Sequence, residues 1–202
     1  MLPVLIRRSA GSVNASIRLY LYRNQFQLTN TDVYYSDGTR YKPAIEVVNH
    51  LKTVMPNIKK VLVLGTGLGS MVNIMHSQNF FPKFTLVEID KVILSWAIEL
   101  MAPAYLKDII PVCDDARGFL NRNADQYDLI FIDIFFGRVV PDFVTEKAFL
   151  MLCREHLSKG GHVAFNYIIN NENEWNEVYR TFSGIFSDCK VIKQDINRIL
   201  IS

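Results

Sequence analysis

Apolar and polar residues alternate in the first part of the chain. The apolar residues recur at every second position, which places Ile17, Leu19 and Leu21 on one face of a predicted strand. A turn is expected at Arg23-Asn24, and residues 25–28 are predicted to return as a second strand. The sequence therefore predicts a small antiparallel β module over residues 1–42.

From residue 43 to residue 202 the pattern changes to helices that alternate with strands. Helices are expected over residues 44–55, 70–76, 91–101, 116–121, 143–157 and 172–186, and strands over residues 60–64, 84–87, 109–112, 129–132, 162–167, 190–194 and 198–201. Such an order predicts a mainly parallel sheet covered on both faces. The last two strands are joined by too little chain for a crossover, so they are expected to pair antiparallel.

One helix end carries its own signal. Lys159-Gly160-Gly161 follows the apolar pattern of residues 143–157, and glycine just beyond a helix is typical of a C-cap. We therefore expect that helix to end there.

Composition narrows the class of protein. Half of the 202 residues are apolar and 21% are charged, which excludes a disordered chain, a collagen and a coiled coil. No run of 18 uncharged apolar residues occurs, so no membrane span is expected. The first eight residues are too short and too soon charged to predict a secretory signal.

The cysteines and the charges add little chemistry. Cys113, Cys153 and Cys189 are odd in number and lack metal-type spacing, so we expect a reduced, cytoplasmic setting. The four histidines show no ligand pattern, and no metal site is expected. Residues 1–60 carry a net charge of +6 and the remainder −4, but the basic residues are scattered, which favours a solvated face over an acidic partner.

Glycines follow the first strand of the second region. Gly65, Gly67 and Gly69 stand at alternate positions between an apolar strand and a helix. Glycine allows a tight turn there and lets a ligand approach the helix N-terminus. The spacing is G-x-G-x-G rather than G-x-G-x-x-G, and the glycines do not lie near the chain start. Both features favour an S-adenosyl ligand over NAD.

Acidic residues follow the next two strands. Glu88 and Ile89 end the second strand, 23 and 24 residues after Gly65, where a carboxylate can accept both ribose hydroxyls. Asp115 and Ala116 follow the third strand, where an acid can accept a hydrogen bond from the adenine amine. Since carboxyl ends of parallel strands meet at one edge, these residues together predict an adenosine site.

These motifs resemble the class I methyltransferase fold and, within it, the spermidine synthase (polyamine aminopropyltransferase) family. The resemblance covers about residues 17–167. Residues 87–90 are identical to the family's V-E-I-D motif. Residues 114–116 (D-D-A) are close to the family motif, and residues 127–133 (Y-D-L-I-F-I-D), 141–149 (P-D-F-V-T-E-K-A-F) and 157–161 match it well. Residues 21–27 and 32–37 match loosely. The resemblance implies a mainly parallel Rossmann-like sheet with an antiparallel last strand.

The resemblance also implies roles for individual residues. Gln27 would contact the nucleoside, Glu88 the ribose and Asp115 the adenine amine. Asp133 would be the acid nearest the transferred group and the base for the attacking amine. An ammonium has no lone pair, so it must lose a proton before it attacks. The implied cofactor is S-adenosylmethionine or its decarboxylated form, and the implied substrate is a small molecule.

Two family acids are replaced in this chain. Leu68 stands at the acid of G-G-G-D-G-G, and Phe136 stands at the second acid of D-S-x-D. A desolvated polyamine needs carboxylates to pair its ammonium groups, so polyamine binding is expected to be weakened. Leu68 also removes an anion that would repel the carboxylate of intact S-adenosylmethionine. We therefore expect a transferase remade toward a less cationic substrate.

Three alternatives stay open. A methyltransferase of unknown substrate would use the same fold. A nucleic-acid methyltransferase would need the D/N-P-P-Y/F motif, but residues 133–136 lack both prolines and no basic groove is evident, so nucleic acid is not favoured. A non-catalytic binding protein is consistent with the lost acids. The β module could supply a homodimer interface.

Overall fold

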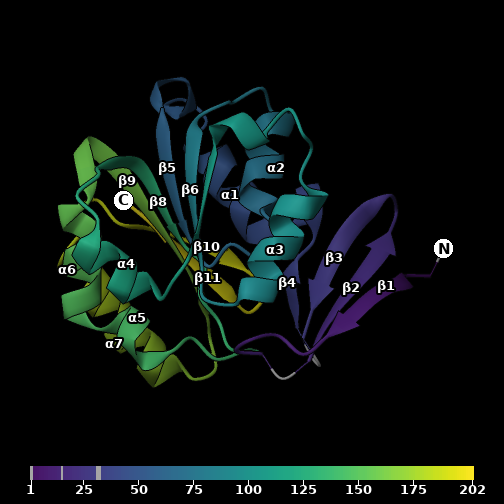
Figure 1. Ribbon diagram of the computed structural model, residues 1–202. Helices are drawn as coiled ribbons and strands as arrows, with labels where there is room; N and C mark the ends of the chain where they lie inside the picture. Colours follow the sequence, from purple (N-terminus) through teal and green to yellow (C-terminus); the bar gives the residue numbers. More distant parts are fainter. Residues whose placement is uncertain (1, 15, 31–32) are drawn as a thin grey trace.

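The computed structural model describes residues 2–14, 16–30 and 33–202 (Figure 1). Asp32, which belongs to the loose N-terminal resemblance, lies outside the described residues. The chain forms a four-stranded sheet in the order β1-β2-β3-β4 and a seven-stranded sheet in the order β10-β11-β9-β8-β5-β6-β7. Figure 1 shows the small sheet beside the layered body formed by the large sheet and its helices.

The small sheet is antiparallel throughout, as the alternation predicts. Its strands are β1 (Val4–Ser9), β2 (Ile17–Tyr22), β3 (Gln25–Thr29) and β4 (Tyr34–Ser36). Ile17 and Leu19 are fully buried, and the turn between β2 and β3 uses Arg23 and Asn24 with positive φ. The strand β1 is not predicted by the pattern, because it lies at the sheet edge with consecutive apolar residues exposed.

The large sheet confirms the predicted fold class. Its strands are β5 (Lys60–Leu64), β6 (Lys83–Glu88), β7 (Ile109–Cys113), β8 (Tyr127–Ile132), β9 (Leu157–Ile168), β10 (Lys190–Gln194) and β11 (Asn197–Ile201). The five neighbouring strands β7, β6, β5, β8 and β9 pair in parallel. β11 is antiparallel to both β9 and β10, as the short connection before it predicts.

Helices cover both faces of this sheet. They are α1 (Lys42–His50), α2 (Ser70–Ser77), α3 (Lys91–Leu100), α4 (Ala116–Arg122), α5 (Asp142–Thr145), α6 (Lys147–Glu155) and α7 (Glu172–Ser183). Short 3₁₀ helices occupy Gly38–Arg40, Met55–Asn57 and Leu106–Asp108. One apolar core lies under α1 and α2, and another lies under α4 to α7 (Figure 1).

Three helix boundaries differ from the prediction. α1 ends at His50, and turns and a 3₁₀ helix containing Pro56 replace its expected last turn. The expected helix over 143–157 is two helices, because Glu146 between them has extended backbone angles (φ −66°, ψ 140°). The expected helix over 172–186 ends at Ser183.

The predicted C-cap at Lys159-Gly160-Gly161 is wrong. β9 already begins at Leu157, so both glycines lie inside the strand. The pairing of β8 with β9 shifts register there, Gly160 has φ +76°, and a Cβ at Gly161 would lie 2.9 Å from the Tyr127 carbonyl oxygen. The glycines therefore serve an irregular strand pairing instead of a helix end.

Apolar residues join the small sheet to the large one. A third cluster combines Ile17, Leu19 and Leu28 with Leu68, Ile93 and Trp96. Each of these six side chains is at most 7% exposed. Burying apolar surface between the two parts stabilises their contact by about 25 cal/mol per Å².

A buried carboxylate reinforces the same junction. Asp90, at the start of α3, accepts hydrogen bonds from the backbone N–H groups of Ser12 (3.1 Å), Val13 (3.2 Å) and Asn14 (3.1 Å). Its burial opposes ionisation, but these bonds and the Asn14 side-chain amide outweigh burial and lower the Asp90 pKa to about 2. A Cβ at Gly11 would lie 2.1 Å from Asp90 Oδ2, so the loop needs glycine at this position.

Candidate active site

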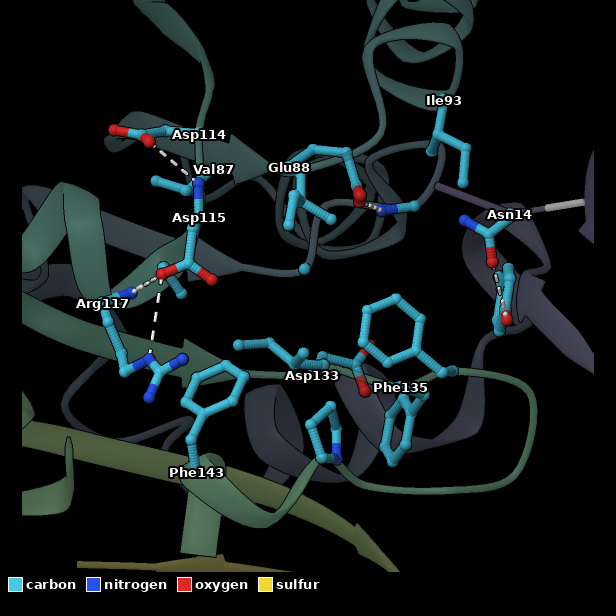
Figure 2. Close-up of a pocket in the computed structure, with 18 residues that line it drawn as sticks. Asn14, Val87, Glu88, Ile93, Asp114, Asp115, Arg117, Asp133, Phe135 and Phe143 are labelled. Carbon is cyan, nitrogen blue, oxygen red and sulfur yellow. Dashed lines mark hydrogen bonds and ion pairs between the residues drawn. The ribbon is translucent and has the colours of Figure 1, made fainter. Parts of the chain in front are cut away.

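A cavity of about 330 Å³ opens where β5, β6, β7 and β8 end (Figure 2). Seven of the predicted site residues line it: Gly65, Gly67, Glu88, Ile89, Asp115, Ala116 and Asp133. Figure 2 shows Glu88 and Asp115 on one side of the cavity and Asp133 and Phe143 on the other. The ends of four neighbouring strands thus bring these residues together, as the topology of open α/β sheets requires.

Gln27 and Gly69 do not line this cavity. Gln27 is 5% exposed, and its Nε2 donates a hydrogen bond to Asp37 Oδ1 at 2.8 Å. Gly69 caps α2 in a left-handed conformation with φ +77°. The structure therefore places Gln27 inside the β module and Gly69 at the helix start.

The glycine loop is shaped by backbone packing. A Cβ at Gly65 would lie 2.2 Å from the Asp133 carbonyl oxygen, and one at Gly67 would lie 2.9 Å from the Tyr35 carbonyl oxygen. Both glycines also have positive φ, +89° and +52°. Glycine at 65 and 67 thus lets the loop fit between the end of β8 and the β module before any ligand is considered.

Glu88 holds the glycine loop in place. Its Oε2 accepts hydrogen bonds from the N–H groups of Thr66 (3.1 Å) and Gly67 (3.3 Å), and its Oε1 accepts one from Asp90 N–H (3.1 Å). Burial raises the Glu88 pKa to about 7, although these N–H groups oppose the rise. Since each carboxylate oxygen can accept about two hydrogen bonds, Oε1 retains one acceptor position.

Asp115 is the N-cap of α4. Its Oδ1 accepts hydrogen bonds from the N–H groups of Arg117 (3.0 Å) and Gly118 (3.1 Å). Among the residues that the structure describes, no donor reaches its Oδ2 in hydrogen-bonding geometry. The neighbouring Asp114 also lines the cavity but is ion-paired with Arg122. Asp115 therefore combines a capping oxygen with a free acceptor oxygen.

Asp133 directly follows β8 and faces two donors. Its Oδ1 accepts hydrogen bonds from the Tyr41 hydroxyl (3.1 Å) and from Asn166 Nδ2 (2.8 Å). Burial raises the Asp133 pKa to about 7; the two donors lower it, and the Glu88 charge adds to the rise. No donor from the described part of the chain binds Oδ2. This oxygen can therefore exchange a proton near neutral pH.

Sequence reasoning missed the residues that hold Asp133. Tyr41 immediately precedes α1, and Asn166 lies within β9. Asn197 Nδ2 donates a hydrogen bond to Asn166 Oδ1 at 2.8 Å, which fixes the orientation of the Asn166 amide. A fully buried asparagine in an otherwise apolar strand is the signal that could have found Asn166.

Leu68 and Phe136, the two positions where the resemblance implies a family acid, lie in different environments. Leu68 is 5% exposed within the cluster that joins the two sheets, and it does not line the cavity. Phe136 does line the cavity and is 43% exposed. The described residues include no group of three or more His, Cys, Asp or Glu side chains placed to hold a metal ion.

A comparison of the sequence with models of known protein families identifies the family of this chain. A family model described as the spermine/spermidine synthase domain matches residues 41–196. The chain belongs to the spermine/spermidine synthase family. This confirms the resemblance carried by the V-E-I-D and Y-D-L-I-F-I-D stretches.

Curated relatives agree with this family. A "probable polyamine aminopropyl transferase" of Bifidobacterium longum is 30% identical over 146 residues, which are 69% of this chain and 32% of the relative. A polyamine aminopropyltransferase of Vibrio vulnificus is 25% identical over 152 residues, 73% of this chain and 51% of the relative. These relatives are transferases, and the chain spans from a third to a half of their length.

Solved structures confirm the fold. Spermidine synthase from Thermotoga maritima aligns with a TM-score of 0.75 at 16% identity, over 98% of this chain and 72% of that one. A spermidine synthase in complex with the transition state analogue AdoDATO aligns with a TM-score of 0.74 at 15% identity, over 98% and 71%. Human methyltransferase-like protein 13 in complex with SAH aligns with a TM-score of 0.65 at 18% identity, over 79% of this chain and 78% of that one. The class I methyltransferase-like sheet is thus shared.

Proposed function

We propose that this protein is an adenosyl-dependent transferase that moves a group from a sulfonium donor to an amine of a small molecule. One observation carries the proposal: Asp133 lies in the same cavity as Glu88 and Asp115, and no donor among the described residues binds its Oδ2. An acid with a raised pKa in a cleft is suited to proton transfer.

The cavity suits an adenosyl group. Glu88 Oε1 has one acceptor position left for a ribose hydroxyl, and Asp115 Oδ2 can accept a hydrogen bond from the adenine amine. Ile89, Ala116 and Phe143 supply apolar walls for a purine ring. S-Adenosylmethionine or its decarboxylated form, when bound, would supply an electrophilic carbon next to the sulfonium, with the neutral thioether as the leaving group when the C–S bond breaks.

Asp133 would act as the general base. Its Oδ2 takes a proton from the ammonium of the acceptor, which frees the nitrogen lone pair for attack. Tyr41 and Asn166 bind the other oxygen, Oδ1, and thereby fix the carboxyl group during the transfer. A base with a pKa near 7 is half ionised at neutral pH, so it can both accept and release the proton.

The choice of substrate follows from the two replaced acids. Phe136 supplies an aromatic wall where the family carries a carboxylate, and Leu68 is packed away from the cavity. Neither can pair an ammonium group. We therefore propose weak spermidine synthase activity and a less cationic acceptor, with intact S-adenosylmethionine bound at least as well as the decarboxylated form. Methyl transfer to a small acceptor is the second candidate, because Leu68 leaves the α2 terminus without a repelling acid.

Product analysis tests the proposal. The protein is incubated with putrescine and decarboxylated S-adenosylmethionine, and separately with intact S-adenosylmethionine and a panel of small amines, with Asp133→Asn as the control. We expect product that depends on Asp133. Binding of S-adenosylhomocysteine without any turnover would instead favour a non-catalytic binding protein. Putrescine turnover of ~1 s⁻¹ or more, an ordinary enzyme rate, would contradict the weakened polyamine site.

We also propose a cellular setting and an assembly for this protein. The described Cys113, Cys153 and Cys189 are free thiols, which supports a reduced, cytoplasmic setting. Leu2, Val4 and Leu5 of the β module are more than half exposed, which supports a homodimer through that module. No helix in the described ranges is long and apolar enough to cross a membrane.

A further inference from the structure

Asn197 reaches the candidate active site from the hairpin of β10 and β11. It is the first residue of β11, where it pairs with Gln194 of β10 and with Ile168 of β9. Its Nδ2 donates a hydrogen bond to Asn166 Oδ1 at 2.8 Å. Asn197 does not line the active-site cavity, so its contact with the site is made through Asn166.

Asn166, Tyr41 and Asp133 form a closed ring of hydrogen bonds. Asn166 Nδ2 donates to Asp133 Oδ1 (2.8 Å) and to the Tyr41 hydroxyl (3.4 Å). The Tyr41 hydroxyl has a single hydrogen, which it donates to Asp133 Oδ1 at 3.1 Å. Asp133 Oδ1 therefore receives two hydrogens, and every hydrogen bond in the ring has a defined direction.

The ring determines which oxygen of Asp133 carries the proton when this acid is protonated. A proton on Oδ1 would face two donors and no acceptor, so at least one of the two hydrogen bonds would be lost. A proton on Oδ2 leaves both bonds intact, and no donor from the described part of the chain binds Oδ2. Oδ2 is thus the oxygen left for a ligand of the cavity that Asp133 lines (Figure 2).

A reversed Asn166 amide would undo this arrangement. A half-turn about the last side-chain bond exchanges Oδ1 and Nδ2, so a carbonyl oxygen would face Asp133 Oδ1. Two oxygens share a hydrogen bond only if one of them bears a proton, and the proton would therefore be drawn to Oδ1. Asn197 opposes the reversal, because the reversal would bring two NH₂ groups together at a fully buried residue.

A second contact holds the hairpin at the same place. Lys42 Nζ lies 3.1 Å from Asp195 Oδ2. Lys42 follows Tyr41 in sequence, and Asp195 lies in the turn between β10 and β11, so the hairpin contacts both segments that supply donors to Asp133. Among the described residues, the titratable groups that face Asp133 are Tyr41 and Glu88, while β9 contributes a neutral amide.

We propose that Asn197 is a positioning residue, which keeps the exchangeable proton of Asp133 on Oδ2 by fixing the orientation of the Asn166 amide. Its effect on the reaction rests on the proposed function, since a base that takes a proton from an acceptor in the cavity must present Oδ2. The place of the proton does not depend on which reaction the cavity performs.

A titration of the aspartate carboxyl groups by carbon-13 NMR, on the whole chain, tests the proposal. The Asp133 signal is assigned by its absence from Asp133→Asn. Asn197→Asp replaces the donor by an acceptor of the same shape, so above about pH 6 the ionised group should reverse the Asn166 amide. We expect Asp133 to bind its proton about tenfold more tightly than in wild type, because the protonated acid then donates a hydrogen bond to the amide carbonyl oxygen.

Two control variants separate this effect from added charge and from a lost side chain. Gln194→Glu makes the same isosteric change on the paired strand, where Gln194 donates to Asp195 and lies outside the ring. Asn197→Ala removes the side chain and leaves Asp133 to select the NH₂ group of Asn166. Each control should change the proton affinity of Asp133 by less than about threefold. Circular dichroism of each variant shows that the fold is retained.

The pH profile of product formation is a second readout. In Asn197→Asp the rise of kcat/KM with pH should occur about one pH unit higher than in wild type, because the base loses its proton later. A purely structural effect would lower the rate by the same factor at every pH.

Three results of the titration would overturn the proposal. An unchanged proton affinity of Asp133 in Asn197→Asp would show that the hairpin does not orient the amide. An equal increase in Gln194→Glu would show that charge alone acts, and an equal increase in Asn197→Ala would assign the effect to the lost side chain. Absence of product from the wild-type protein would instead contradict the proposed transferase, and the titration would still decide where the proton lies.

Discussion

Asn166 donates a hydrogen bond of 2.8 Å to the carboxylate of Asp133, from a strand that begins 24 residues further along the chain. This contact links β9 to the end of β8 inside the candidate active site. Asn197 binds the carbonyl oxygen of the same amide, so the Asn166 NH₂ group must point toward Asp133. The donor is neutral, which leaves the proton affinity of Asp133 governed mainly by burial.

The pH dependence of stability should report this raised proton affinity. The Asp133 pKa is about 7 in the folded chain and close to 4 when unfolded, so the folded state binds more protons between these values. Its contribution to the free energy of unfolding therefore falls as pH rises from about 4 to about 7. In urea denaturation, the Asp133 contribution should lower the wild-type free energy of unfolding by about 1 kcal/mol or more between pH 5 and pH 7. The Asp133→Asn variant should lack this decrease.

The control for this measurement is Asp128→Asn. Asp128 follows Tyr127 in the same strand, but its pKa is lowered, since hydrogen bonds from Ser158 and from Lys59 and Lys60 outweigh its burial. An identical pH profile for wild type and Asp133→Asn would show that Asp133 titrates normally.

Adenosyl binding should depend on two carboxylates that can be replaced by their amides. Asp115→Asn keeps the capping oxygen of α4 but replaces the free acceptor by a donor. Glu88→Gln likewise replaces one carboxylate oxygen by an NH₂ group, here at the proposed ribose position. Each should weaken S-adenosylhomocysteine binding by about 1.5–3 kcal/mol in a calorimetric titration. Unchanged affinity in both variants would remove the adenosyl site assignment.

Acid should weaken the contact between the two sheets. The Asp90 pKa is about 2 when folded and close to 4 when unfolded, so its contribution is fully present above about pH 4 and is lost as pH falls toward 2. Asp90→Asn should lose this dependence and should also be less stable at pH 7 by about 1–3 kcal/mol. Thermal unfolding between pH 2 and pH 7 measures both effects, and a parallel profile for the two proteins would contradict the prediction.

The substitution Leu68→Asp should lower the stability of the protein, whatever its effect on the choice of cofactor. The side chain is buried in the apolar cluster that joins the sheets, which also contains Leu19 and Trp96. A carboxylate there would be desolvated without a partner, so we expect a loss of stability of about 3 kcal/mol or more in urea denaturation. Leu68→Met is the volume-conserving control and should cost less than about 1.5 kcal/mol. A folded, equally stable Leu68→Asp protein would mean that this position can turn toward the cavity.

The mainly parallel sheet and half of the site could be predicted because their signals are local. Gly65, Glu88, Asp115 and Asp133 each lie at or within two residues of a strand's carboxyl end, and the topology of parallel strands carries them to one edge. The prediction of one helix over 143–157 is wrong because the apolar spacing continues across Glu146, where only the backbone angles mark the break between α5 and α6.

The missing half of the site depends on contacts between distant parts of the chain. Tyr41 is 92 residues from Asp133 in sequence, and nothing in its neighbourhood predicts a hydrogen bond to that carboxylate. Leu68 occupies a loop position that suggests access to a ligand, yet the β module packs over it. A one-dimensional pattern cannot show which loop side chains a distant sheet will cover.

The loop that binds Asp90 makes the β module inseparable from the rest of the chain. A fragment that began at Pro43 would expose Leu68, Ile93 and Trp96 together and would strip Asp90 of the donors from residues 12–14. It would hold an apolar patch beside an uncompensated carboxylate, a combination that favours aggregation. Any exchange of the module between related proteins must therefore transfer a glycine at position 11 and an acid at position 90 as one unit.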